Sequence, residues 1–128
     1  MILVYILIGI VLFFLAFRFM MFSKMRKQKG KPAPELSGIF GKAIQQGKPA
    51  LFYFYSESCG ACRPMTPVVD NLKKEKLPCY KVDITHHMDI AKKFGVMATP
   101  STVLVNKGIV QEFLIGPQNE SKLRSLLR

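Results

Sequence analysis

The sequence has no tryptophan and only three cysteines among its 128 residues, and it contains no internal repeat or low-complexity segment. Three cysteines form one pair at most, so one thiol is left without a partner. Basic and aromatic residues do not interleave as they do on nucleic-acid-binding surfaces, so we do not expect a nucleic acid partner. Acidic residues are also few. From Pro32 onward there are 13 Lys and Arg against eight Asp and Glu, and much of the basic excess lies earlier in the chain.

Polar residues are scarce from Met1 to Phe22, where only Tyr5, Gly9 and Arg18 interrupt an apolar run. A transmembrane helix needs about 20 such residues. A cleaved signal peptide is the main alternative, but no basic region precedes the run and no small-x-small cleavage pattern follows it. A buried core helix is rarely apolar on every face at this length. We therefore expect residues 1–22 to form a retained transmembrane anchor.

A basic cluster directly follows the apolar run; it consists of Lys24, Arg26, Lys27, Lys29 and Lys31. The positive-inside rule then places the rest of the chain in the cytoplasm, and an extracytoplasmic domain is the alternative. The same cluster is suited to anionic lipid headgroups. We therefore expect the lipid bilayer to be a partner through residues 1–22 and this basic juxtamembrane cluster.

The remaining sequence divides into a linker and one domain. Residues 23–36 combine charge with Gly and a Pro-Ala-Pro run, which predicts a linker with extended backbone. Residues 37–128 contain segments typical of helices in alternation with segments typical of strands. The predicted elements are a helix at 39–46, a strand at 50–55, a helix at 67–76, a strand at 79–84, a helix at 87–95, strands at 101–106 and 109–116, and a helix at 118–128. This order predicts an α/β fold whose mixed central sheet is flanked by helices.

The stretch 55-YSESCGACRPMTP-67 places two cysteines between a predicted strand and a predicted helix. A helix N-terminus favours a thiolate, and Arg63 adds positive charge nearby. We therefore predict that Cys59 is the attacking thiol and Cys62 the resolving thiol of a disulfide-exchange pair. Gly60 and Ala61 are small, so that a substrate chain is able to approach closely.

Two other uses of these cysteines are compatible with their number and spacing. Zinc could take Cys59, Cys62, Cys79 and either His86 or His87. However, Cys79 begins a predicted core strand, which favours a buried thiol instead. A structural disulfide between Cys59 and Cys62 would close a loop too short to stabilise the fold much. We expect no metal and no organic cofactor.

The chain from about Ser37 to Arg128 resembles thioredoxin. The residues that carry the resemblance are 50-ALFYFYSESCGACRPMTP-67, 81-KVDI-84, 94-FGVMATPSTVLVNKG-108 and Gly116. A lone CxxC is a weak signal, but its combination with Ala-Thr-Pro-Ser about forty residues later is a strong one. The resemblance implies a thioredoxin fold and thiol–disulfide oxidoreductase activity on disulfide-containing proteins. It also implies an upstream reductase or other electron donor.

The resemblance further implies roles for individual residues. The Thr99–Pro100 bond is expected to be cis and to face the cysteines. The backbone at Thr99 and Pro100 is expected to pair with the substrate peptide as an added strand. Pro67 corresponds to the proline that kinks the active-site helix in the family.

The sequence also departs from the family pattern. Ser58 replaces the usual Trp, and Ala61 stands where Pro is common. Tyr53 replaces a buried Asp that handles the proton of the resolving thiol, whereas Lys81 matches the lysine near that Asp. Tyr53 and Lys81 are therefore the candidates for proton handling at Cys62.

Together these patterns predict a membrane-anchored thiol–disulfide oxidoreductase that reduces protein disulfides in the cytoplasm. An extracytoplasmic oxidase, isomerase or electron relay is an alternative. A redox-inactive binding module with the same fold is an alternative of another class, motivated by the missing Trp and Asp.

Overall fold

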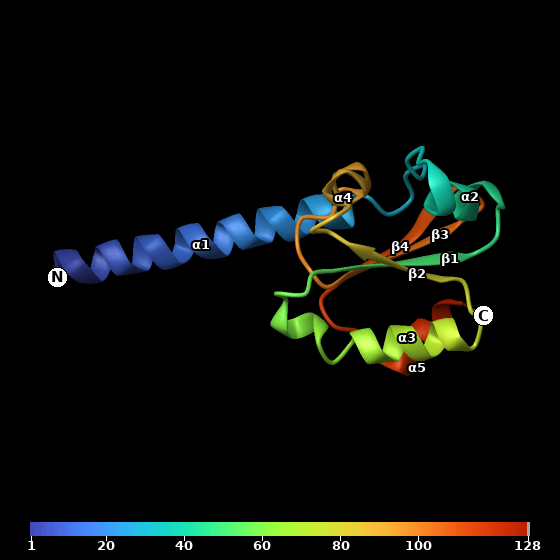
Figure 1. The fold of residues 1–128 in the computed structure, drawn as a ribbon. Helices are drawn as coiled ribbons and strands as arrows, with labels where there is room; N and C mark the ends of the chain where they lie inside the picture. The colour runs from blue at the N-terminus through green and yellow to red at the C-terminus, as the bar shows by residue number, and fades with distance from the viewer. Residues whose placement is uncertain (128) are drawn as a thin grey trace.

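The computed structural model describes residues 1–127 as one long helix followed by an α/β domain (Figure 1). The elements are α1 (Ile2–Arg26), α2 (Gly38–Gln45), β1 (Ala50–Tyr55), the 3-10 helix η1 (Gly60–Cys62), α3 (Thr66–Lys74), β2 (Cys79–Asp83), α4 (Met88–Phe94), β3 (Ser101–Asn106), β4 (Ile109–Ile115) and α5 (Glu120–Leu126). The predicted order of strands and helices is confirmed from α2 to α5. Arg128, which ended the predicted last helix, lies outside the described residues.

Within residues 1–127 the sheet has four strands in the order β2-β1-β3-β4. β1 and β2 are parallel and the other two pairs are antiparallel, which confirms the predicted mixed sheet. Tyr55 pairs with Asp83, Phe54 with Ser101, and Ser101 in turn with Ile115. The carboxyl ends of β1, β2 and β4 therefore meet the amino end of β3 at one edge, which we call the cysteine edge because Cys59 follows β1 there.

Helices cover both faces of the sheet (Figure 1). Side chains of a strand alternate between faces, so Phe52 and Phe54 pack with α2 and α4, whereas Leu51 and Tyr53 pack with α3 and α5. These four side chains are fully buried. Burial on both faces explains why β1 appears in the sequence as a continuous apolar run.

Single residues mark the end of α4 and the start of α5. Gly95 follows α4 with φ of 75°, the left-handed conformation that commonly ends a helix. Asn119 precedes α5, and its side-chain oxygen accepts the backbone N–H of Lys122 at 2.8 Å.

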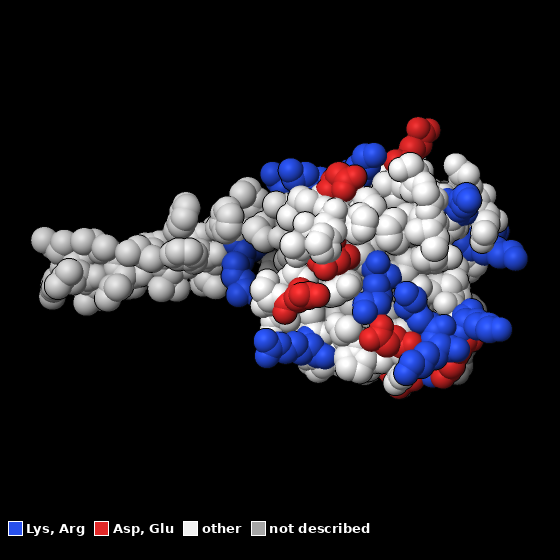
Figure 2. Space-filling model, viewed as in Figure 1, with Lys and Arg blue, Asp and Glu red and all other residues white. Residues whose placement is uncertain are grey.

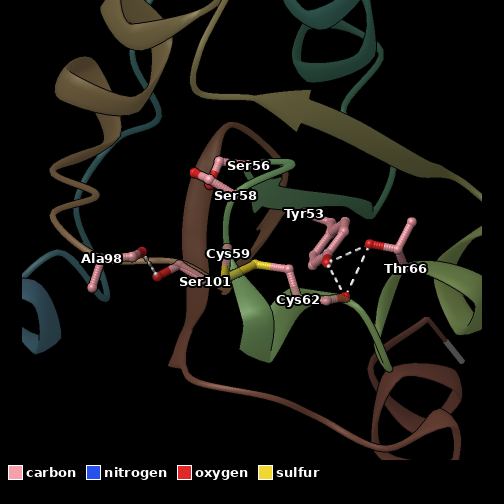
Figure 3. Close-up of a disulfide and its surroundings, with 8 residues drawn as sticks. All are labelled: Tyr53, Ser56, Ser58, Cys59, Cys62, Thr66, Ala98 and Ser101. Carbon is pink, nitrogen blue, oxygen red and sulfur yellow. Dashed lines mark hydrogen bonds between the residues drawn. A yellow bond between two sulfur atoms is a disulfide. The ribbon is translucent and has the colours of Figure 1, made fainter.

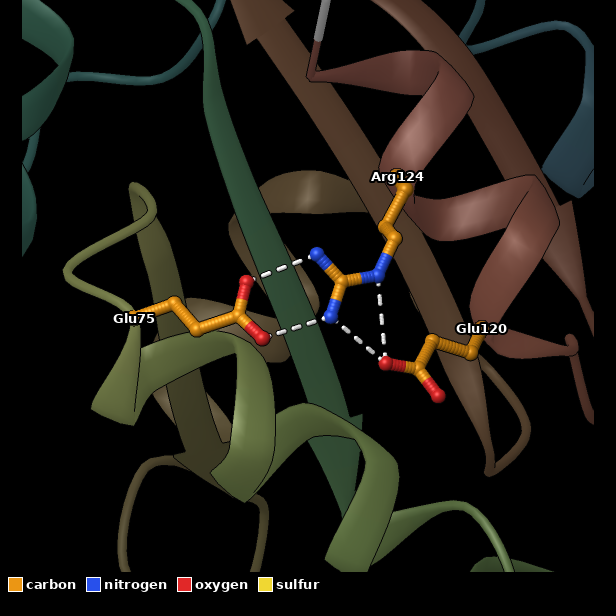
Figure 4. A network of polar contacts seen from close by, with 3 residues as sticks. All are labelled: Glu75, Glu120 and Arg124. Carbon is orange, nitrogen blue, oxygen red and sulfur yellow. Dashed lines mark hydrogen bonds and ion pairs between the residues drawn. The ribbon is translucent and has the colours of Figure 1, made fainter.

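An ion-pair network connects α5 to the end of α3 (Figure 4). Arg124 donates two hydrogen bonds of 2.7 Å to Glu75, and two more of 3.1 and 2.7 Å to Glu120. The hydrogen bonds from Arg124 lower the pKa of Glu75. The bidentate geometry links α5 to the C-terminal end of α3 at the surface of the domain.

Helix α1 is apolar for most of its length and extends past the predicted end at Phe22. It is long and apolar enough to cross a membrane, a test that a signal sequence also passes. In the view of Figure 2, charged side chains lie on the domain and near the base of α1, and none lies on its outer part. The last turn belongs to the domain, because Met25 is only 1% exposed and packs into the core on the α4 side.

The segment after α1, expected as part of a linker, also contacts the domain. It runs beside β4, an edge strand with free backbone groups. The contacts are Gly30 N–H to Val110 O (2.7 Å), Val110 N–H to Lys31 O (2.9 Å), Ala33 N–H to Gly108 O (2.8 Å), a Pro32–Ile109 bridge, and an ion pair between Lys29 and Glu112 (3.1 Å). These bonds join α1 firmly to the sheet.

Candidate active site at the cysteine pair

Cys59 and Cys62 form a disulfide, and their Cα atoms are 5.3 Å apart. β1 ends at Tyr55, and the loop that follows delivers Cys59 to the start of η1. Cys59 is half-buried, whereas Cys62 is 1% exposed. Gly60 and Ala61 between them are exposed. The outer sulfur is thus accessible to a partner and the inner one is shielded, as an attacking and a resolving thiol require.

The helix predicted at 67–76 is observed as α3, but it does not extend back to the cysteines as expected for Cys59. η1 ends at Cys62 and α3 begins only at Thr66. Pro64 lacks the N–H that would continue an α-helix back to Gly60, whose carbonyl accepts from Arg63 instead at 3.3 Å. Pro67 lies in the first turn of α3, where its missing N–H costs nothing. Pro67 therefore begins a new helix and does not kink a continuous one, and the predicted helix N-terminus at Cys59 is reduced to one 3-10 turn.

The backbone carbonyl of Cys62 receives three hydrogen bonds, and Figure 3 shows those from Tyr53 and Thr66. The donors are Met65 N–H at 3.1 Å, Thr66 Oγ1 at 3.0 Å and the Tyr53 hydroxyl at 3.2 Å. The hydroxyl oxygens of Tyr53 and Thr66 are also 3.0 Å apart. Sequence reasoning missed Thr66, although its position four residues after Cys62 was a usable signal.

Tyr53 lies beneath Cys62 as a neutral hydrogen-bond donor. Its side chain is 0% exposed and stacks on the ring of Tyr55 at 5.3 Å between centroids. Burial raises the pKa of Tyr53 above its ordinary value, so the phenol keeps its proton at neutral pH. A protonated phenol is not a general base, and its visible role is to hold the Cys62 backbone.

Lys81 lies beside the disulfide with a carboxylate partner that the sequence did not reveal. Its Nζ is 3.1 Å from Asp70 Oδ1 on α3 and 5.0 Å from the ring centroid of Tyr55. Lys81 lines a surface pocket of about 390 Å³ together with both cysteines. A larger depression of about 690 Å³ lies away from the cysteines, between residues 33–36, α2 and the turn between β3 and β4.

The Thr99–Pro100 peptide bond is cis, as the resemblance implied. Pro100 is buried and Thr99 half-buried. Two hydrogen bonds hold the loop in place. Ser101 donates to Ala98 O at 2.6 Å (Figure 3), and Gly116 N–H donates to Pro100 O at 2.8 Å. Since Ser101 begins β3, this loop lies at the cysteine edge of the sheet.

The residues considered for zinc do not come together. Cys79 is 3% exposed in the core between the sheet and α3, and burial raises the pKa of its thiol to about 11. His86 is exposed. Among residues 1–127, no group of three or more His, Cys, Asp or Glu side chains is placed to hold a metal ion. Cys79 is thus a free, buried thiol.

A disulfide with one accessible sulfur, set after the central strand and on the same sheet edge as a cis-proline loop, defines a thiol–disulfide exchange protein. The family model for thioredoxin matches residues 34–128. The chain belongs to the thioredoxin family and is a thiol–disulfide oxidoreductase, and thioredoxins act on disulfide-containing protein substrates.

Individual relatives agree with this assignment. Thioredoxin from Alicyclobacillus acidocaldarius is 32% identical over 91 residues, which cover 69% of this chain and 87% of that protein. H-type thioredoxin from Fagopyrum esculentum is 33% identical over 68% of this chain and 77% of its own length. The crystal structure of Fasciola hepatica thioredoxin matches with a TM-score of 0.61 and 32% identity, covering 69% of this chain and 88% of its own.

Proposed function

We propose that this protein is a membrane-anchored protein-disulfide reductase. The observation that carries the redox part is the pairing of a half-buried Cys59 with a buried Cys62. Anchoring is supported by the exposure of apolar side chains at consecutive positions of α1: Phe13, Phe14 and Leu15 are 68, 60 and 58% exposed. Successive helical residues point about 100° apart, so this helix is apolar around its circumference and is suited to lipid.

The reaction begins when the Cys59 thiolate attacks one sulfur of a substrate disulfide. A Cys59–substrate bond forms, the substrate S–S bond breaks, and the released substrate sulfur takes a proton. The Cys62 thiolate then attacks Cys59 Sγ, releases the second substrate thiol and closes the Cys59–Cys62 disulfide. Two electrons have passed to the substrate, and an upstream dithiol reductase returns the pair to the reduced form.

Proton handling at Cys62 is assigned to the Lys81–Asp70 ion pair: the thiol proton passes through water to the Asp70 carboxylate, and the positive charge of Lys81 stabilises the Cys62 thiolate. Lys81 lines the same pocket as Cys62, whereas the Tyr53 proton is retained and engaged with the Cys62 carbonyl. In this assignment Tyr53 positions Cys62 and does not exchange protons with it.

The substrate peptide occupies the surface around Cys59. Gly60 and Ala61 are exposed and small, which favours close approach of a second chain. Thr99 and Pro100 offer backbone next to β3 for pairing with an extended peptide. Specificity then depends mainly on what reaches this edge of the domain.

The direction of electron flow follows from sidedness. The basic cluster after α1 favours a cytoplasmic domain, where thiols are kept reduced. A reduction potential of the Cys59–Cys62 pair at or below the glutathione poise of about −220 to −260 mV would support a reductase. A value well above this range would favour the oxidase, isomerase or electron-relay alternative on the outer side.

The two-cysteine mechanism predicts opposite results for two substitutions. Cys59→Ser is expected to abolish reduction of a disulfide substrate, while Cys62→Ser is expected to stop after one attack and accumulate a mixed disulfide. The mixed disulfide is measured by mass spectrometry without reducing agent. Cys79→Ala is the matched control and is expected to keep multiple turnover, because its thiol is buried away from the pair.

Full turnover by Cys62→Ser would contradict this mechanism. If the unsubstituted chain reduces the substrate no faster than free dithiol does, the alternative of a redox-inactive binding module would be supported instead.

A further inference from the structure

The membrane anchor leaves the domain at the cysteine edge. Pro32 bridges to Ile109, Lys31 bonds to Val110, and further back Lys29 reaches Glu112. Followed toward the N-terminus, the chain therefore runs along β4 from its first residue toward its carboxyl end. That end belongs to the cysteine edge, so α1 departs on the same side as Cys59.

The shape of the molecule agrees with this register (Figure 1). The loop that carries η1 lies at the end of the domain from which α1 projects. Helix α2 and the turn between β3 and β4 lie toward the opposite end. The disulfide therefore faces the side from which the anchor enters.

The connection between anchor and domain is short and rigid. Only Ser23 and Lys24 separate Phe22, the last residue of the apolar run, from Met25 in the domain core. Three helical steps of 1.5 Å span about 4.5 Å. α1 is continuous through this region, and the Gln28 side chain packs against Gly95. The domain is thereby held close to the membrane surface in one orientation.

Apolar side chains are also exposed at the cysteine edge. Met97, just before the cis-proline loop, is 53% exposed, and Met88, at the start of α4, is 46% exposed. Methionine side chains are flexible and adapt to apolar partners of varied shape.

From this geometry we infer that the active site faces the bilayer and acts on disulfides that membrane-embedded proteins carry near the headgroups. The inference rests on the proposed anchoring and reductase activity. A disulfide of a protein in the same membrane, close to the headgroups, meets Cys59 at a higher effective concentration than a disulfide held far from the bilayer or free in solution. Cys59 attacks the nearer sulfur of that disulfide, Cys62 completes the exchange, and the partner leaves as a dithiol.

The test uses the full chain in lipid vesicles with two transmembrane peptides that carry the same disulfide-bonded loop. In one peptide the loop follows the membrane helix directly. In the other a rigid helical spacer of about 27 residues moves it about 40 Å away. Initial rates of loop reduction are measured with dithiothreitol as electron donor. We expect the proximal loop to react about tenfold faster or more. Equal rates, or faster reduction of the distal loop, would overturn the inference.

A matched variant carries a flexible Gly-Ser insertion of about 20 residues between Phe22 and Ser23, which leaves Met25 and the β4 contacts in place. It is expected to lose the preference for the proximal loop, and a preserved preference would overturn the role of rigid docking. Two further measurements separate failure of this inference from failure of the proposed function.

The first is reduction of a soluble copy of the loop; if neither the original chain nor the insertion variant reduces it, the proposed reductase activity is wrong. The second is flotation with vesicles; if the chain does not float with them, both the anchoring and this inference are wrong.

Discussion

Tyr53 occupies the buried position beneath Cys62 where the family resemblance leads one to expect a carboxylate. Its hydroxyl donates to the Cys62 carbonyl, and burial keeps the pKa of the phenol above its usual value. At this position, therefore, a hydroxyl group that donates a hydrogen bond stands in place of a carboxylate that could accept a proton. Lys81 and Asp70 remain as the ionisable pair next to the disulfide.

Replacing Tyr53 by Phe separates positioning from proton transfer. Tyr53→Phe is expected to lower the free energy of unfolding by about 1 kcal/mol, because one hydrogen bond to a buried carbonyl is lost. Turnover is expected to stay within a few-fold of the original, as measured by disulfide reduction alongside urea unfolding. Tyr55→Phe is the matched control. A loss of about 100-fold in turnover with intact folding would instead assign proton transfer to Tyr53.

Burial of Cys79 makes the free energy of unfolding depend on pH in the alkaline range. The folded chain holds the thiol proton up to about pH 11, whereas an unfolded chain releases it near pH 8.5. The contribution of this buried thiol to the free energy of unfolding is therefore fully present below about pH 8.5. It is lost as the pH rises to 11, where the free energy of unfolding is expected to be lower by about 3 kcal/mol. Urea unfolding of the disulfide form at pH 8 and at pH 11 measures this loss. Cys79→Ala is expected to show a smaller fall over the same range, and equal falls would contradict the assignment.

At the scale of elements, the last turn of α1 is part of the domain core. Met25→Ala in the full chain is expected to lower the free energy of unfolding by about 2–4 kcal/mol, since it removes a buried side chain. Met20→Ala is the matched control, because Met20 is on the same helix and is 49% exposed. Denaturation in detergent micelles measures both, and equal small effects would mean that α1 is not docked.

At the scale of the whole molecule, the proposed orientation gives the domain one end near the membrane and one end far from it. A fluorophore on Cys59 of the Cys62→Ser variant is expected to be quenched strongly by headgroup spin-labelled lipid. The comparison is Lys48→Cys in a chain that also has Cys59→Ser and Cys62→Ser. Lys48 is exposed and precedes β1, at the far edge of the sheet, so weak quenching is expected there. Stronger quenching at position 48 would reverse the proposed orientation.

Much of this molecule follows from local sequence patterns. The apolar run of β1, the amphipathic α5 and the glycine after α4 are local signals, and each predicted its element near the observed bounds. The cysteine spacing and the Thr99–Pro100 pair likewise indicated the two loops that meet at the cysteine edge. The interruption between η1 and α3 was less visible, because the effect of Pro64 and Pro67 depends on which carbonyls they would otherwise have faced.

The element order, the thioredoxin resemblance, the cysteine pair and the apolar helix can all be read from residue type and short-range spacing. Three features depend on how distant segments pack: Thr66 and Tyr53 hold the Cys62 carbonyl, Asp70 pairs with Lys81, and the segment after α1 runs along β4. Strand register determines which side chains from distant segments meet, and register arises from packing of the whole sheet. For the same reason only the folded domain shows that helix α1 and Cys59 leave the sheet at the same edge.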